Sequence, residues 1–546
     1  MTRLILAMLL AGASPALADT LYTNANGYTL DDAGALHRFA TLVVADDGHV
    51  KATLPAGAAL PAGTRIDMAG ATLWPGLIDA HGHVMGLGEE RLQIDLRDTG
   101  SIPDALARIK AGLPATGWVR GRGWNQERWY DGSKLVGRFP TASELDTATG
   151  DRPAAFARVD GHALWVNSAA LKVAGITKDT NDPPGGQIIR DSVGNPTGVF
   201  VDNAIALMAD KIPHADAARR DLELQMALET MASVGLTGAH DAGMDKDTWD
   251  RYLRFAGAGK LTARIYAMAF GPKNRAEIAP NVPIGWGWHD LLAMQSMKLV
   301  SDGALGSRGA YLLAPYADMP NTRGLEIIPA AELKSLITTA SAQGFQVNVH
   351  AIGDAANRAT MDGFAAVPAA ERALRRHRNE HAQIVDKADI DRFASLNVIA
   401  SMQPTHATSD KGMAEARVGD ARLVGGYAWQ TIEKSGAALA LGSDFPVEPP
   451  DPMFGIHAAV TRQSRDGLPP GGWRPWEKLT LTQALAGFTL WAARAGHAET
   501  KVGTLTPGKW ADFITLERDP FTAPEGDLWK IKVTGTWLAG KQVFKR

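Results

Sequence analysis

His81 and His83 end a largely apolar run, Leu73 to Ala80, that is typical of a buried β-strand. Alternate residues of a strand point to the same face about 6–7 Å apart, so both imidazoles can bind one metal ion. A lone His-x-His pair is weak evidence, because strand-end histidines more often hydrogen-bond to carbonyl groups. Whether this pair binds a metal therefore depends on what the rest of the chain places beside it.

Other metal-compatible side chains follow later hydrophobic runs of the same kind. Each has an ordinary explanation by itself, as a capped histidine or as the turn chemistry of an aspartate after Gly-Ser. Their recurrence at the ends of separate strands is harder to explain in that way, and it predicts a metal centre. The set comprises His81, His83, Lys298, His350, His381 and Asp444.

Lys298 is the exception in this set. An ammonium group is a poor metal ligand, and burying it in an apolar strand is costly. One interpretation is that Lys298 extends along the strand to a carboxylate. The other is that CO₂ converts it to a carbamate, whose two oxygens could bridge two neighbouring ions. The chain has no cysteine, so thiolate sites are excluded and a metal must bind histidine, carboxylate or modified side chains.

The elements that position these groups form a strand–helix alternation. Helical stretches such as 220–232 and 330–342 lie between most of the strands. This pattern predicts an α/β fold, a (β/α)₈ barrel of the TIM type, in which catalytic groups gather at the C-terminal strand ends. The predicted strands are 72–79, 236–240, 263–270, 297–300, 345–350, 378–381, 398–402 and 438–441.

The segment between the first and second predicted strands is far too long for a loop. It predicts a large insertion after the first strand, a subdomain or lid at 96–230 that lies over the barrel mouth. Aromatic and hydrogen-bonding groups there suit a ligand pocket, although each has a structural role as its alternative. The candidate substrate-binding residues are Trp124, Asn125, Asp160 and His162 in the insertion, Arg308 after the fourth strand and His406 after the seventh.

Two further histidines invite comparison with the candidate ligands. His240 ends the second predicted strand, where it either supports the metal site from outside its ligand shell or is purely structural. His377 lies in the run Arg375 to Arg378, and we expect it to face solvent.

Both ends of the chain are rich in short extended runs, at 19–70 and at 500–546. Neither end is long enough to form a domain alone, so we expect them to combine in one small β-sandwich. The barrel is then assigned to 71–499.

The first 18 residues have the pattern of a secretory signal. Arg3 is followed by the apolar run Leu4 to Ala11, and Ala16-Leu17-Ala18 is a small-residue cleavage site. We expect cleavage after Ala18 and export to the periplasm. No later stretch of 18 apolar residues occurs, so no membrane span is expected in the mature chain.

Composition limits the partners. Lys and Arg number 56 and Asp and Glu 59, which gives a net charge of −3 and no basic field for nucleic acid. A small-molecule substrate is the expected partner, and the sequence leaves open whether the chain forms a homo-oligomer.

Six motifs together resemble the amidohydrolase superfamily, and within it the YtcJ-like amidohydrolase 3 group, which includes N-substituted formamide deformylases. The resemblance covers nearly the whole mature chain. The motifs are Pro75 to His83, Lys298 to Arg308, Val349 to Asn357, Glu380 to Ala382, Gly442 to Pro446 and Gly503 to Asp512.

The resemblance implies a divalent-metal barrel with a composite sandwich. It implies His81, His83, His350 and His381 as ligands, a carboxylated Lys298 as a bridge, and Asp444 as ligand and proton shuttle. Relatives differ in whether they bind one or two ions and whether the lysine is modified. Neutral histidine ligands suit zinc, with manganese and iron as alternatives.

A bound metal lowers the pKa of water towards about 7, which supplies hydroxide for attack on a carbonyl group. We therefore predict an exported metal-dependent hydrolase. The resemblance, and not the residues themselves, implies that it cleaves the C–N bond of an amide, an N-acyl or N-formyl compound. An ester, lactone or cyclic imide hydrolase on the same site is the alternative. A non-catalytic binding or regulatory protein is the alternative from another class, and it predicts gaps among the ligands.

Overall fold

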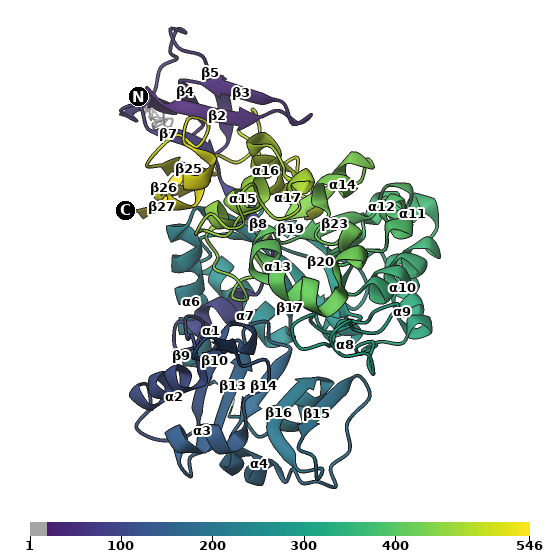
Figure 1. Ribbon diagram of the computed structural model, residues 1–546. Helices are drawn as coiled ribbons and strands as arrows, with labels where there is room; N and C mark the ends of the chain where they lie inside the picture. The colour runs from purple at the N-terminus through teal and green to yellow at the C-terminus, as the bar shows by residue number, and fades with distance from the viewer. Residues whose placement is uncertain (1–18, 214) are drawn as a thin grey trace, which may run out of the picture.

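The computed structural model describes residues 19–213 and 215–546. The expected signal peptide, 1–18, lies outside these residues. A barrel occupies the middle of the molecule, with a two-sheet β unit at one end and a second α/β unit at the other (Figure 1). Among the described residues, no helix has both the length and the apolar character needed to cross a bilayer.

Eight parallel strands form the barrel, in the order β24-β23-β22-β21-β20-β18-β17-β8. Most of their residues are buried, as expected for parallel strands that are covered on both faces. β19 (Ile284–Gly287) adds an antiparallel neighbour to β20. The strands are β8 (Leu77–Gly82), β17 (Leu236–Met244), β18 (Arg264–Phe270), β20 (Leu292–Val300), β21 (Gln346–Ala351), β22 (Arg378–His381), β23 (Ile399–Met402) and β24 (Leu439–Leu441).

The barrel closes just beyond β24. The backbone N–H of Asp444 donates to the carbonyl of His81 at 2.7 Å, and the N–H of His83 donates to the carbonyl of Phe445 at 2.7 Å. The predicted eight-stranded parallel barrel is therefore confirmed, and its closure joins the first and last of the predicted ligand segments.

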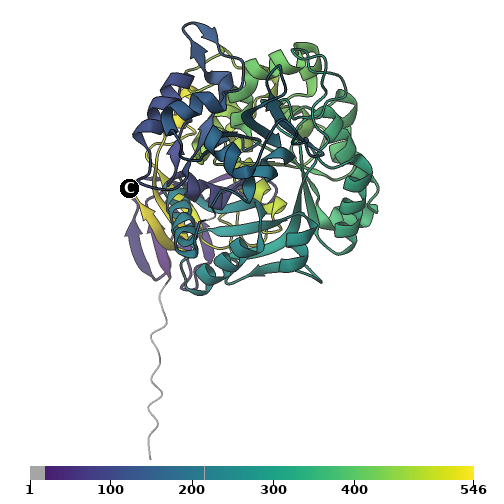
Figure 2. The same cartoon turned by 90° about the horizontal axis from the view of Figure 1, so that it is seen from below.

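Helices surround the strands, as the teal-to-green ribbons of Figure 2 show. Most of these helices pack apolar residues onto the barrel in one continuous core. They are α6 (Ala217–Ser233), α7 (Lys246–Gly257), α8 (Gly271–Ile278), α9 (Ala330–Ala342), α10 (Asp354–Ala365), α11 (Ala369–Arg375), α12 (Ile390–Ser395), α13 (Pro404–Val418), α14 (Trp429–Lys434), α15 (Pro452–Thr461), α16 (Leu481–Gly487) and α17 (Leu490–Ala495).

Two sheets built from both ends of the chain pack beside the barrel. Their orders are β5-β4-β1-β6 and β27-β26-β25-β7-β2-β3, and Phe513 stacks on Trp537 at 4.6 Å between ring centroids. The strands are β1 (Thr20–Thr23), β2 (Asn26–Leu30), β3 (Leu36–Phe39), β4 (Thr41–Val44), β5 (Val50–Leu54), β6 (Thr64–Asp67), β7 (Thr72–Pro75), β25 (Phe513–Leu516), β26 (Val533–Leu538) and β27 (Lys541–Lys545).

The predicted strand 72–79 is wrong as a single barrel strand. The chain leaves one sheet after β7 and enters the barrel at β8, and Gly76 lies between them. A Cβ atom on Gly76 would lie 2.2 Å from Thr237 Oγ1, so the crossing requires glycine. The apolar pattern continues through both strands because both are buried, which hides the break.

Residues 94–202 build a further sheet, β15-β16-β14-β13-β10-β9, which we call the 94–202 unit. It has its own core around Trp124, Phe156 and Trp165. α6 begins within the predicted 96–230 segment but packs on α1 (Val84–Glu90), beside the barrel. The strands are β9 (Ile94–Asp95), β10 (Val119–Trp124), β13 (Ala154–Arg158), β14 (Ala163–Val166), β15 (Gly186–Arg190) and β16 (Pro196–Asp202), with helices α2 (Ile102–Ala111), α3 (Ala142–Thr149) and α4 (Ser168–Ala174).

Candidate metal centre and its cavity

His81 is fixed at the C-terminal end of β8 by a buried carboxylate. Its Nδ1 lies 2.5 Å from Glu380 Oε2, and both side chains are almost fully inaccessible. Arg378 in turn donates from Nε to Glu380 Oε1 at 2.7 Å. An imidazole that donates through Nδ1 keeps the Nε2 lone pair free, which is the tautomer that a metal ligand needs.

His381 and His350 enter from the neighbouring strand ends. His381 Nδ1 lies 2.9 Å from Gln403 Oε1, and its ring centroid is 4.5 Å from that of His350. Burial, followed by the charge of nearby basic groups, holds the pKa of both imidazoles well below the usual value, so both are neutral. His381 has φ +73°, a left-handed conformation that is costly outside glycine and typical of functional sites.

The turn after β24 brings Asp444 next to His81 and His83. Its Oδ1 lies 3.1 Å from His83 Nε2 and 3.6 Å from His81 Nε2. A Cβ atom on Gly442 would lie 2.5 Å from Asp79 Oδ1, so only glycine allows the turn to approach β8 this closely. Burial opposes ionisation of Asp444, but the hydrogen bond to His83 and the neighbouring histidines outweigh it and lower its pKa.

Lys298 lies on β20 with its Nζ 3.3 Å from His81 Nε2. It is 3% exposed, and burial lowers the pKa of its ammonium group, although Glu380 and Asp444 oppose this shift. Burial therefore favours the neutral amine, which is the form that reacts with CO₂.

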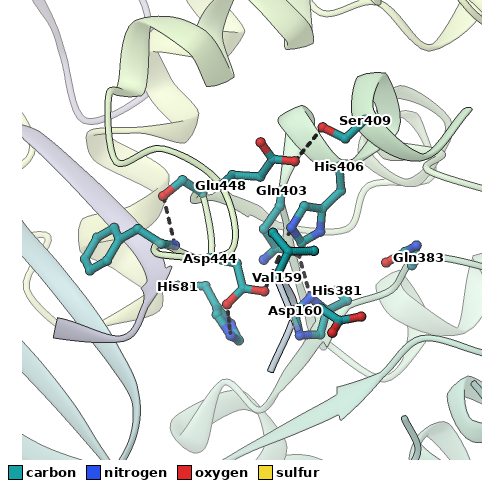
Figure 3. A network of polar contacts seen from close by, with 12 residues as sticks. His81, Val159, Asp160, His381, Gln383, Gln403, His406, Ser409, Asp444 and Glu448 are labelled. Atoms are coloured by element: carbon teal, nitrogen blue, oxygen red, sulfur yellow. Dashed lines mark hydrogen bonds and ion pairs between the residues drawn. The ribbon is translucent and has the colours of Figure 1, made fainter. Parts of the chain in front are cut away.

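The donor set fits a divalent cation. His81, His83 and Asp444 offer ligand atoms within 4.8 Å of one another, and so do His381, His406 and Asp444. Within the described part of the chain, the Nε2 atoms of His350 and His406 are buried without a hydrogen-bond partner. Figure 3 shows His81, His381 and His406 grouped around Asp444. Neutral imidazoles and a carboxylate are the ligands that zinc prefers.

The metal-compatible groups lie on a cavity of about 730 Å³. All six predicted ligands line it, together with residues of the 94–202 unit. A volume of this size suits a small-molecule ligand.

Comparison with known proteins agrees with this geometry. A profile of the amidohydrolase family matches residues 64–544. The chain belongs to the amidohydrolase family. YtcJ of Bacillus subtilis, whose name assigns it to the amidohydrolases, is 32% identical over 521 residues, 92% of this chain and 96% of its own.

Two further proteins are similar to this amidohydrolase over nearly their whole length. The N-substituted formamide deformylase of Arthrobacter pascens is 27% identical over 556 residues, 97% of this chain and 99% of its own. The structure of an uncharacterized metal-dependent hydrolase of Pyrococcus horikoshii has a TM-score of 0.74 and 26% identity, and the match covers 93% of this chain and 99% of that one. The protein is thus an enzyme, a metal-dependent hydrolase of the class that acts on carbon–nitrogen bonds, as its motifs predicted.

Four of the predicted substrate residues of the amidohydrolase line the cavity, namely Asn125, Asp160, His162 and His406. His162 Nδ1 lies 2.6 Å from Asp202 Oδ1, and Asp160 pairs with Arg158.

Trp124 and Arg308 are not among the cavity-lining residues. Trp124 is fully buried in the core of the 94–202 unit, where its indole N–H donates to the carbonyl of Phe156 at 2.7 Å. Arg308 instead pairs with Asp318 at 3.0 Å. Both side chains thus have structural partners away from the cavity, and their substrate contacts stay predictions.

Sequence reasoning missed the buried charged side chains next to the predicted ligands, above all Arg378 and Glu380. Arg378 also donates to His240 Nδ1 at 2.8 Å and to the carbonyl of Ala80 at 2.6 Å. The signal was present, because Arg378 and Glu380 are alternate residues of one strand and must share a face. His240 is held within this network rather than at the cavity.

The expectation that His377 faces solvent is wrong. It is fully buried, and its Nδ1 accepts the backbone N–H of Val347 at 3.0 Å. Its ring stacks on Phe364 with centroids 5.1 Å apart. The flanking arginines suggested an exposed loop. His377 instead directly precedes β22, and its imidazole is buried in the barrel wall.

Proposed function

We propose that this amidohydrolase cleaves the C–N bond of an amide, specifically an N-acyl or N-formyl compound. The observation that carries the proposal is the position of Asp444. Its carboxylate lies against His81 and His83 on a cavity of suitable size for a small amide. The formamide deformylase of Arthrobacter pascens supports the bond type.

Asp444 is the proton carrier in this proposal. Its lowered pKa keeps the carboxylate ionised at neutral pH, so an Oδ atom can accept the proton of the water that adds to the carbonyl carbon. When the C–N bond breaks, the same oxygen returns that proton to the leaving nitrogen. The products are a carboxylic acid and an amine, which balances one water consumed.

The ligands of the proposed divalent ion are His81, His83, His350 and His381 with Asp444. We propose zinc, as one ion or two, and a carbamate on Lys298 would be a further ligand. A bound ion supplies Lewis-acid polarisation of the carbonyl group and a water of lowered pKa. The low-pKa, buried amine of Lys298 supports the carbamate.

The 94–202 unit supplies the substrate contacts in this proposal. His162 lies on the cavity with its Nδ1 against Asp202, which leaves Nε2 for the substrate. Burial opposes protonation, but Asp202 and Asp160 outweigh it and raise the pKa of His162 to about 9. The resulting imidazolium can donate to a substrate oxygen, while the side-chain amide of Asn125 offers a further polar contact.

The test is turnover by the zinc-loaded protein of three matched substrate sets. These are N-acyl amino acids, N-formyl amines, and the corresponding esters, lactones and cyclic imides. Release of amine from the N-acyl or N-formyl sets, absent in the chelator-treated protein and restored by zinc, supports the proposal. Ring opening of lactones or imides with no amine released from any acyclic amide would overturn it.

We also propose that the enzyme is exported to the periplasm after removal of residues 1–18. The charge, apolar run and small-residue site at the start of the chain support this. Amino-terminal sequencing of the protein from the periplasmic fraction should begin at Asp19. An intact Met1 in a protein confined to the cytoplasmic fraction would contradict it.

A further inference from the structure

His406 is buried, which is unlike a substrate-contacting residue on the open surface of a cavity. It lies in the first turn of α13, directly after β23, and its residue is 8% exposed. Among the described residues, no hydrogen-bond partner is available to its Nε2. A buried imidazole nitrogen without a partner is destabilising, so an unused donor or acceptor here indicates a missing ligand.

The free nitrogen points towards the carboxylate that the metal centre already uses. His406 Nε2 lies 3.9 Å from Asp444 Oδ2, whereas His81 and His83 lie against Oδ1 of the same carboxylate. Asp444 therefore presents its two oxygens to two different groups of histidines. Figure 3 shows His406 on the opposite side of this carboxylate from His81.

His381 completes the second group. Its ring is nearly parallel to that of His406, at 15°, with centroids 6.1 Å apart. Gln403 donates from Nε2 to the carbonyl of Ser401 at 3.3 Å, which directs its Oε1 at His381 Nδ1. His381 Nε2 is then left without a proton and free to bind a cation.

We propose that His406, His381 and Asp444 form a cation subsite, in which His406 is a metal ligand rather than a substrate contact. The three ligand atoms lie within 4.8 Å of one another. Ligand atoms bound to one zinc ion at about 2.0–2.1 Å lie closer to one another than this limit. Binding therefore requires only a small inward movement of the three side chains. The set that the family motifs imply does not include His406, because this residue comes from α13 and not from a strand end.

The proposal accounts for the unpartnered nitrogen of His406. The cation gives the buried His406 nitrogen its partner, and it neutralises the second oxygen of a buried carboxylate. A substrate group in the same place would also give the nitrogen a partner, but it would leave metal binding independent of residue 406. The two interpretations therefore differ in the absence of any substrate.

The experiment is a cobalt titration of chelator-stripped protein, with visible absorption and metal content as readouts. The variants are His406→Gln and, as a matched control, His162→Gln, which removes a cavity imidazole outside the cluster. We expect His406→Gln to weaken cobalt binding by at least about 10- to 100-fold and to change the absorption spectrum. His162→Gln should retain both wild-type properties.

Wild-type affinity, stoichiometry and spectrum in His406→Gln would overturn the proposal, as would an equal loss in His162→Gln. The melting temperature of each stripped variant is measured first, and His406→Asn replaces the glutamine variant if that one does not fold. Because no substrate is present, the outcome is independent of which bond the enzyme cleaves.

Discussion

Two groups of buried histidines differ in how their nitrogens are used. His240 and His377 lie in the barrel wall, where Arg378 and the backbone of Val347 provide their hydrogen bonds. His350 and His406 lie at the cavity, and each has a buried Nε2 with no partner within the described chain. All four are less than a tenth exposed, so burial does not separate them.

For these four histidines, unused hydrogen-bonding capacity, rather than burial, distinguishes the cavity pair from the pair in the barrel wall. Folding normally satisfies buried polar groups, because an unsatisfied one is costly. A wall histidine therefore stabilises the fold, whereas a cavity histidine is retained at a cost that a ligand offsets. Substitutions in the two regions should accordingly change different properties, activity at the cavity and stability in the wall.

Asp444→Asn should have the largest effect, on activity and not on the stability of the fold. The change removes the proton carrier, so kcat should fall by about 10²–10⁴-fold. Asparagine tolerates the left-handed φ of +60° at this position, so the melting temperature should stay close to that of the wild type. Steady-state kinetics and thermal unfolding of the zinc-loaded protein measure both. Unchanged kcat would show that Asp444 does not carry the proton. Substitutions at the cavity would then not differ from those in the barrel wall in their effect on activity.

Arg378→Met should have the largest effect on stability. It leaves the Glu380 carboxylate buried without its cation, and such broken pairs cost about 3–5 kcal/mol. Denaturant unfolding of the stripped protein gives the change in the free energy of unfolding. Removing both charges, in Arg378→Met with Glu380→Gln, should cost less than the sum of the two single changes. Strict additivity would show that the pair is not coupled.

A smaller effect should follow from His377 when the pH falls. Burial, and then Arg375 and Arg372, lower the pKa of His377 from 6.5 to about 3. Between these values the unfolded chain binds a proton that the native chain does not, so stability decreases as the pH falls. The loss from pH 7 to pH 5 is about 2 kcal/mol for this one group.

His377→Gln isolates this contribution. Unfolding free energies of wild type and variant, measured at pH 7, 6 and 5, should converge by that amount as the pH falls. Parallel curves would mean that His377 binds protons equally in the native and unfolded states, and burial would then not lower its pKa.

Much of the fold followed from local pattern. The runs around Val347, Ile399 and Leu439 are short, apolar and separated by helical periods, so parallel strands were predicted close to their observed positions. The break at Gly76 was missed because both flanking strands are buried and no polar residue marks the change of sheet. The division of the chain into domains beyond these sheets stays a prediction.

The candidate site was predictable where ligands follow strands. His81, His83, Lys298, His350, His381 and Asp444 all line one cavity. Trp124 was misplaced because an aromatic side chain suits a pocket and a core equally well in sequence. Arg308 was misplaced because its partner, Asp318, is in a loop that no pattern positions.

The sequence by itself determined which side chains stand at the ends of the strands, since strand alternation is a local property of the backbone. Only the tertiary structure decided which nitrogens remain free. Hydrogen bonds between His81 and Glu380, or His240 and Arg378, join residues 299 and 138 positions apart. Such pairings depend on barrel closure, and barrel closure decides which histidines serve the fold and which are left for a ligand.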